Sequence, residues 1–114
     1  MLTHLLLFRP RADLAAQDRA DLVSVLRQAL GSIPSIQRAR VGRRVMHGRP
    51  YEQAMRVHYE FAALLEFDDV AGLKAYLEHP AHDALATRFF SVVDEALIYD
   101  FELAEGEDGL ANLA

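Results

Sequence analysis

The clearest structural signal in the sequence is a two-residue alternation over residues 56 to 67. One phase carries apolar side chains, namely Val57, Tyr59, Phe61, Ala63, Leu65 and Phe67. The other phase is mixed and comprises His58, Glu60, Ala62, Leu64 and Glu66. Because successive side chains of a strand point to opposite faces of a sheet, this alternation predicts a β-strand from Arg56 to Phe67.

Three elements are predicted before this strand. Residues 2 to 9 form an apolar run that Arg9-Pro10 closes, which predicts a first strand. Apolar residues at helical spacing predict a helix that begins at about residue 13 or 18 and ends at Leu30, before Gly31 and Pro34. Residues 36 to 45 are rich in Arg and Val and precede a turn-prone segment, so we expect a second strand there.

Two elements and a tail are predicted after the alternating strand. Asp68 or Asp69 is suited to cap a helix, which Pro80 restarts and which continues to about Val93. Residues 96 to 103 then form a last strand. Residues 104 to 114 contain three acids and two glycines, and we expect a loose acidic tail there.

The predicted order of elements is β-α-β-β-α-β. This order closes most simply as a four-stranded antiparallel sheet with both helical segments on one face, which is the α+β ferredoxin-like arrangement. A chain of 114 residues, 52% of them hydrophobic, suffices for one compact domain. We therefore expect a single domain over residues 1–103, followed by the tail of residues 104–114.

The first and the last strand of this sheet are apolar on both faces. Leu5 and Leu7 alternate with other apolar residues in the first strand, as Leu97 and Tyr99 do in the last. A sheet that helices cover on one side only normally has a polar second face, so this surface predicts a partner. We expect a homodimer in which two sheets pack face to face as a dimeric α/β barrel and enclose a partly apolar cavity.

The composition excludes several partners. A formal net charge of −5 argues against nucleic acid or an anionic membrane as a partner, since either favours a basic surface. The chain has no cysteine and no apolar run of membrane-spanning length. We expect a soluble, cytoplasmic protein without a cofactor or a metal. The charges are nevertheless unevenly placed, because ten of the twelve basic residues lie at or before Arg56.

The segment from Tyr76 to His82 holds the strongest candidates for chemistry. Pro80 disfavours the helical region for His79 and suits the first turn of a new helix, so His79 lies at a junction and His82 follows in the first turn. The unpaired N–H groups and the dipole at a helix start disfavour a protonated imidazole. His82 is therefore expected to be neutral near pH 7 and able to accept a proton.

Each candidate also has a structural interpretation. His79 can bond backbone groups at the junction, and Tyr76 shares a helical stripe with Leu73 and Leu77, as a packed core tyrosine would. His4 lies in an apolar run, where a buried histidine with satisfied hydrogen bonds is common. Metal binding by His79 and His82 lacks an adjacent third ligand.

The sequence resembles the stress-responsive α/β barrel (Dabb) family from about Leu2 to Phe101. The resemblance rests on the first-strand histidine, on Ile33-Pro34, on the run from Tyr59 to Phe67, on the segment from Tyr76 to His82 and on Tyr99-Asp100-Phe101. It implies a ferredoxin-like fold and a dimeric barrel more firmly than it implies an activity, because most members have no assigned reaction.

One characterised relative, the plant olivetolic acid cyclase, implies roles for particular residues. Its catalytic tyrosine and histidine match Tyr76 and His82, and a further cavity histidine matches His4. By this resemblance His82 is a general base that removes a proton next to a carbonyl, and Tyr76 hydrogen-bonds the carbonyl or enolate oxygen. A third-strand cavity histidine of the cyclase corresponds to about Phe61 here, so the pocket differs and only the reaction class carries over.

The expected function is therefore acid–base chemistry on a small carbonyl or polyketide-like compound, of a cofactor-independent lyase or cyclase type. His82 and Tyr76 are the expected catalytic residues, and His4, His79 and Phe61 the expected substrate-binding residues. Two alternatives remain open. The chain would otherwise be a module that binds a small apolar or aromatic ligand without changing it, or a stress-associated structural dimer.

Overall fold

Four strands form one antiparallel sheet in the order β2-β3-β1-β4. The strands are β1 Leu2–Pro10, β2 Arg38–Arg43, β3 Phe61–Phe67 and β4 Val93–Glu102. The computed structural model describes residues 1–114, and in it β1 is a central strand that pairs with both β3 and β4. The sheet and the order of its strands confirm the predicted α+β ferredoxin-like fold.

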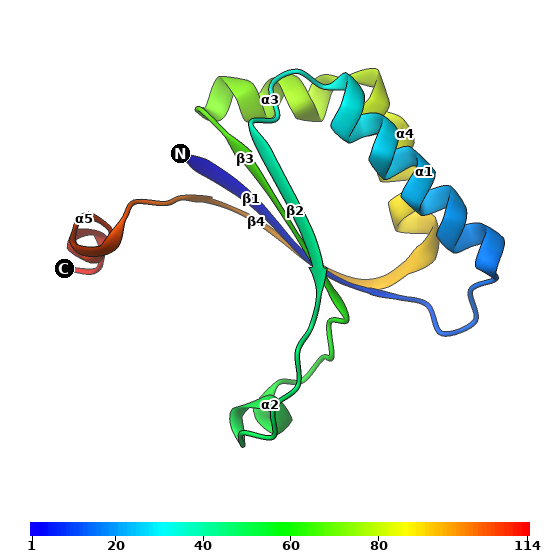
Figure 1. The fold of residues 1–114 in the computed structure, drawn as a ribbon, viewed down its shortest axis with the longest axis horizontal. Coiled ribbons are helices and arrows are strands. Elements are labelled where there is room, and N and C mark those ends of the chain that lie inside the picture. The colour runs from blue at the N-terminus through cyan, green and yellow to red at the C-terminus, as the bar shows by residue number, and fades with distance from the viewer.

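Three helices cover one face of the sheet: α1 Ala16–Ser32, α3 Val70–Glu78 and α4 Pro80–Val92 (Figure 1). The side chain of Asp69 caps α3 by accepting a hydrogen bond from the Gly72 amide at 2.9 Å. A cluster of buried residues fills the space between these helices and the sheet. Within it the ring of Phe8 packs against the rings of Phe61 and Phe89, whose centroids lie 5.7 and 5.2 Å away.

The opposite face of the sheet carries no helix (Figure 1). Strand alternation places a continuous set of apolar side chains on this open face, contributed by β1, β3 and β4: Leu5, Leu7, Ala62, Leu64, Leu97, Tyr99 and Phe101. Tyr99 and Phe101 are 54% and 47% exposed. The other set of alternating side chains is buried against the helices. The open face is therefore a large apolar surface without a partner inside the chain.

Residues 44–60, which we call the arm, leave the sheet and project on its open side (Figure 1). The alternating strand predicted from Arg56 therefore begins only at Phe61, and the arm contains the short helix α2, Tyr51–Ala54, which was not predicted. The reason is the lack of neighbouring strands. Phe61 pairs with Arg43 and Phe8, and beyond it a single bond from the Arg44 amide to the Glu60 carbonyl continues the ladder.

The C-terminal segment after β4 also projects from the sheet (Figure 1). We expected a loose tail over residues 104–114, but the segment contains helix α5, Gly106–Leu110, and a 3-10 turn, Ala111–Leu113. β2 is shorter than the strand predicted for residues 36 to 45, and β4 begins earlier than the last strand predicted for residues 96 to 103. None of the helices combines the length and the apolar character that crossing a bilayer would require.

Candidate functional site

A cavity of about 190 Å³ lies between the sheet and the helices. Its walls come from β1, β2, β3, β4 and the three covering helices, and 14 of its 16 lining residues are hydrophobic. The lining residues with polar side-chain atoms are His4, Tyr76 and His82. A largely apolar cavity with a few convergent polar groups is the usual form of a small-molecule site.

Tyr76 lies at the centre of the three polar side chains. Its ring centroid is 5.6 Å from that of His4 on β1 and 4.7 Å from that of His82 on α4, both in edge-to-face geometry. Tyr76 is 2% exposed and also packs against Phe67. The fold therefore brings three of the predicted site residues, which are up to 78 positions apart, into one cavity.

The surroundings of His82 disfavour the protonated form of its imidazole. Its pKa is lowered from the ordinary value of 6.5, chiefly because burial disfavours the charged ring; His4 lowers the pKa further, while Asp83 opposes the shift. The predicted neutral state near pH 7 is thus supported, with burial as the main cause. A neutral imidazole in an apolar cavity can accept a proton from a ligand.

The hydroxyl of Tyr76 stays protonated at ordinary pH. Burial raises its pKa to about 12, and no hydrogen bond or neighbouring charge contributes to this shift. A phenol in this state is a hydrogen-bond donor that the protein leaves free for a ligand. Tyr76 is therefore suited to donate to an oxygen atom and not to act as a base.

His4 has a carboxylate partner that was not predicted from the sequence. Its Nδ1 lies 2.6 Å from Oδ1 of Asp100, which stands directly opposite it on β4. A carboxylate only accepts hydrogen bonds, so Nδ1 carries the proton and, in the neutral ring, Nε2 is left as an acceptor. The pair thus fixes the tautomer and the orientation of His4. The only sequence signal for it is that both residues lie on predicted strands.

The position of the cavity differs from the expected one. The sequence predicted a cavity between two packed sheets, but the cavity that contains His4, Tyr76 and His82 lies on the helix-covered face and within one chain. The cause is which set of alternating side chains of β1 faces the helices. His4 alternates with Leu5 and shares a face with Leu6 and Phe8, which point toward the helices.

His79 does not line this cavity, although we predicted that it binds substrate. It is the N-cap of α4, where its Nδ1 accepts a hydrogen bond from the Ala81 amide at 3.0 Å. Its extended backbone, with ψ at 140°, is the conformation that a following proline requires. The geometry therefore supports the structural interpretation of His79. No three His, Cys, Asp or Glu side chains are arranged to hold a metal ion.

Phe61, the other predicted substrate-binding residue, also lies away from the cavity of His82. It starts β3, stacks on Phe8 at a centroid distance of 5.7 Å, and lines a separate groove beneath the arm. The two predicted catalytic residues and His4 thus converge, while His79 and Phe61 lie elsewhere.

Comparison with known proteins agrees with this architecture. Residues 2–103 match the model of the stress-responsive A/B barrel domain family. No curated protein matches the chain.

Three solved structures share the fold over nearly the whole chain. A protein of Arabidopsis thaliana is 19% identical, with 94% of this chain and 99% of that one covered and a TM-score of 0.76. A hydroxynitrile lyase from Passiflora edulis is 14% identical, with 92% and 94% covered and a TM-score of 0.75. A dimeric ferredoxin-like protein of unknown function from Thermobifida fusca is 21% identical, with 90% of both chains covered and a TM-score of 0.70. The chain belongs to the stress-responsive A/B barrel (Dabb) domain family.

Proposed function

We propose that the protein is a homodimer in which the cavity of each chain binds a small carbonyl compound and catalyses acid–base chemistry on it. The reaction is of a lyase or cyclase type that uses the side chains of the cavity alone. The observation that carries this proposal is the convergence of His4, Tyr76 and His82 on one apolar cavity.

The dimer is supported by the open face of the sheet. Leu97, Tyr99 and Phe101 are between 38% and 54% exposed there, and a second copy of the same face would remove them from water. Similar proteins from Thermobifida fusca and Bacteroides fragilis are described as dimeric. The open face of the sheet lies opposite the cavity of His82. Dimerisation through the open face therefore leaves that cavity on the outer, helix-covered side of the barrel.

The catalytic roles follow from the protonation states of the two central residues. His82, whose pKa burial lowers, is neutral and acts as the base. Tyr76, whose pKa burial raises to about 12, donates a hydrogen bond to the carbonyl oxygen as negative charge develops on it. The hydrogen bond from His4 to Asp100 keeps Nε2 of His4 available as a second acceptor.

The proton balance of such a reaction closes within the cavity. His82 takes the proton from the carbon next to the carbonyl, and the electron pair moves to the oxygen that Tyr76 bonds. The enolate carbon then bonds to a second carbonyl carbon, and the new alkoxide takes the proton back from His82. Cleavage of a hydroxynitrile, the kind of reaction that the name of the Passiflora edulis neighbour states, would use His82 as the base in this chain. There His82 removes the hydroxyl proton, the carbon–carbon bond breaks, and cyanide leaves and takes up the proton.

Deuterium exchange tests the proposal without knowledge of the natural substrate. A panel of methyl ketones, 1,3-diketones and aldehydes is incubated with the protein in D2O, and loss of the α-proton signal is followed by NMR. We expect acceleration for at least one compound, and we expect His82→Gln to lower the exchange rate by about 10²- to 10⁴-fold. A parallel assay measures release of aldehyde from hydroxynitriles.

The control variant is His79→Gln, because His79 caps α4 and does not line the cavity. It should keep the exchange rate of the wild type at a temperature where it is folded. Equal exchange in wild type and His82→Gln, or no acceleration with any compound, would contradict the catalytic proposal.

A ligand-binding module is the second candidate, and the apolar lining of the cavity favours it. In that case native mass spectrometry finds a retained small molecule, and the compounds of the panel bind without exchange. Loss of the retained mass in His82→Gln and Tyr76→Phe would assign the ligand to this cavity.

A further inference from the structure

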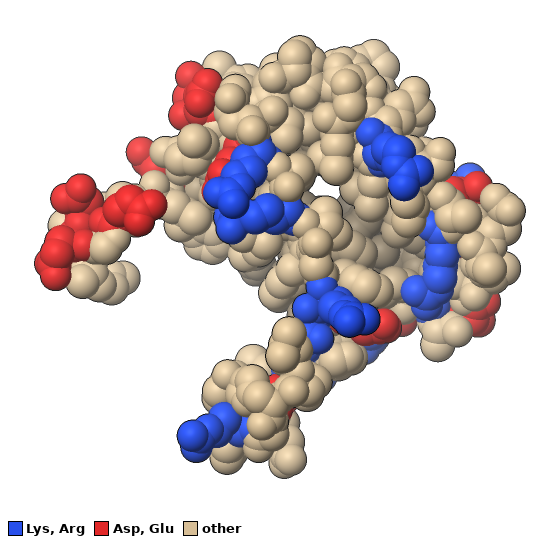
Figure 2. Space-filling view, in the orientation of Figure 1, with Lys and Arg blue, Asp and Glu red and all other residues tan.

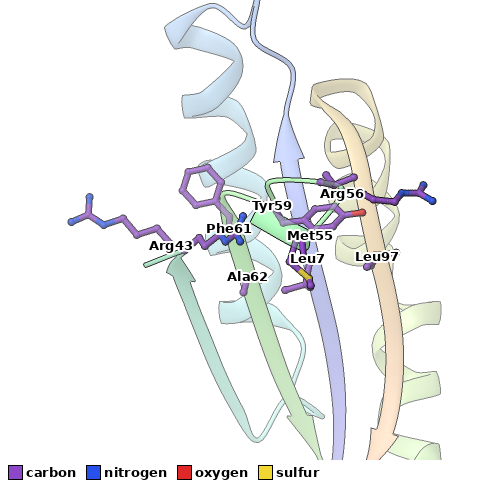
Figure 3. A pocket seen from close by; sticks show the side chains of 11 residues that line it. Leu7, Arg43, Met55, Arg56, Tyr59, Phe61, Ala62 and Leu97 are labelled. Atoms are coloured by element: carbon purple, nitrogen blue, oxygen red, sulfur yellow. The ribbon is translucent and has the colours of Figure 1, made fainter. Parts of the chain in front are cut away.

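A second hollow lies on the open side of the sheet, beneath the arm. It has a volume of about 660 Å³ and an apolar floor formed by Leu7, Ala62 and Leu97 of the open face. Met55 and Tyr59 of the arm form its wall, and Arg43 and Arg56 extend outward from its two sides (Figure 3). We call this hollow the arm groove. It is distinct from the cavity of His82, which lies on the other face of the sheet.

The arginines of the arm groove have no acidic side chain within ion-pair distance, although the positive charge of Arg44 helps to lower the pKa of Glu52. Arg43, Arg44 and Arg56 take part in none of the ion pairs of the chain. Arg44 is half-buried and its Nη1 bonds Nδ1 of His58 at 2.8 Å, a contact that supplies no negative charge when the ring is neutral. Three guanidinium groups around an apolar floor favour an occupant that is both apolar and anionic.

The arm that forms the wall is held in shape by its own contacts. The buried carboxylate of Glu52 accepts hydrogen bonds from the amides of His47 at 2.9 Å and Gly48 at 2.7 Å, and Gly48 has a φ of 91°. These bonds lower the pKa of Glu52, which therefore stays ionised. The groove thus has a defined wall before anything occupies it.

The C-terminal segment has the complementary character. Glu102, Glu105, Glu107 and Asp108 belong to none of the ion pairs, and Figure 2 shows acidic side chains gathered on this projecting segment. Its leucines are exposed as well, Leu103 by 53%, Leu110 by 55% and Leu113 by 84%. The segment is an acidic and apolar peptide that its own chain leaves uncovered.

We propose that the acidic C-terminal segment of one protomer docks in the arm groove of its partner. This inference rests on the proposed homodimer. The segment and the arm leave opposite ends of the sheet and both project on its open side, so the segment does not reach the groove of its own chain (Figure 1). A second copy packed against the open face brings an acidic segment to a basic groove at the same interface. The exchange is reciprocal, as a two-fold axis requires.

Cysteine cross-linking of full-length chains tests the docking, because the natural sequence has no cysteine. Met55→Cys in the groove wall and Leu110→Cys in the segment are made as separate single variants, mixed, and oxidised. We expect a disulfide between the two different chains, identified as a joined peptide by mass spectrometry. The control replaces Met55→Cys by Val23→Cys, a similarly exposed position on α1, which should not link to Leu110→Cys.

The outcomes separate this inference from the proposed dimer. A protein of dimeric mass that forms no cross-link between positions 55 and 110 would contradict the docking but not the homodimer. A protein of monomeric mass would contradict both the homodimer and the docking. A small anionic molecule that stays bound after removal of residues 104–114, and is lost in Arg43→Glu, would overturn the docking in favour of a ligand.

Charge reversal gives a second test that does not depend on cysteine geometry. Glu105→Lys with Glu107→Lys should raise the dissociation constant of the dimer by about tenfold at low salt, and less at high salt. Adding Arg43→Glu and Arg44→Glu to the same chain should recover part of the loss. Equal dissociation constants for wild type and Glu105→Lys with Glu107→Lys at low salt would contradict the docking.

Discussion

His4 and Asp100 stand directly opposite each other on β1 and β4, with Nδ1 and Oδ1 2.6 Å apart. The side chain of His4 is 6% exposed, while that of Asp100 is 41% exposed. The pair therefore joins a buried ring in the cavity to a carboxylate at the edge of the sheet. Through this bond an edge strand fixes the acceptor nitrogen that the cavity presents.

Asp100→Asn tests this relationship. The amide either donates to Nδ1 or accepts from it, so the tautomer of His4 is no longer fixed. We expect the exchange rate of the best carbonyl compound to fall by about 10- to 100-fold while the near-UV circular dichroism is unchanged. A control at Asp94, which pairs with Arg9 outside the cavity, should leave the rate unchanged. An Asp100→Asn variant as active as wild type would show that His4 needs no fixed tautomer.

Tyr76 allows its packing role and its hydrogen-bonding role to be separated. Tyr76→Phe keeps the ring and removes a hydroxyl whose pKa shift comes from burial alone, so the free energy of unfolding should change by less than about 1 kcal/mol. Tyr76→Ala removes a buried ring and should cost about 3 to 5 kcal/mol.

The exchange rate of Tyr76→Phe should nevertheless fall by about 10²-fold, because the developing oxyanion loses its donor. Chemical denaturation and the NMR exchange assay measure the two effects on the same samples. A Tyr76→Phe variant that is less stable but keeps the exchange rate of the wild type would show that Tyr76 only packs in the core.

The stability of the protein should depend on pH through His82. The pKa of His82 is lowered from 6.5 in the folded chain, so the unfolded chain binds the proton more readily. The free energy of unfolding therefore falls as the pH drops below 6.5 and is recovered above it. Urea midpoints at about pH 7.5 and about pH 5.5 should differ less in His82→Gln than in wild type. If the two urea midpoints of His82→Gln differ as much as those of the wild type, or more, His82 is not the source of the pH dependence.

The open face predicts that a single charge disrupts the dimer. Tyr99→Asp places a carboxylate in the middle of the apolar set of β1, β3 and β4, and an unpaired charge at a buried interface is costly. We expect the dissociation constant to rise on the order of 100-fold, measured by analytical ultracentrifugation. Val23→Asp, at a similarly exposed position on α1, is the matched control and should dissociate no more than wild type.

The sequence predicted the strands of the sheet well wherever a strand has neighbours. Residues 61–67 alternate and pair on both sides, whereas residues 56–60 alternate equally well and lie in the arm. Alternation reports which side chains are apolar, but a strand exists only where another strand supplies hydrogen-bond partners. Such partners depend on the length of β2, which ends at Arg43.

Only part of the site could be predicted, and the reason is related. Tyr76 and His82 are close in sequence and both sit on predicted helices, so their proximity follows from local structure. The contact of His4 with Asp100 depends on the register of two strands 96 residues apart, which no local pattern determines. The face on which His4 lies was equally undetermined, because β1 is apolar in both phases.

The central claim is that the cavity presents a neutral imidazole of His82 to a bound carbonyl compound. An NMR titration of the His82 ring in the wild-type protein tests this claim most directly, because it needs no knowledge of the substrate. We expect a midpoint below 6.5 and a change in the His82 signals when a carbonyl compound that undergoes exchange is added. A midpoint at or above 6.5, or signals that no such compound alters, would contradict the catalytic role of His82.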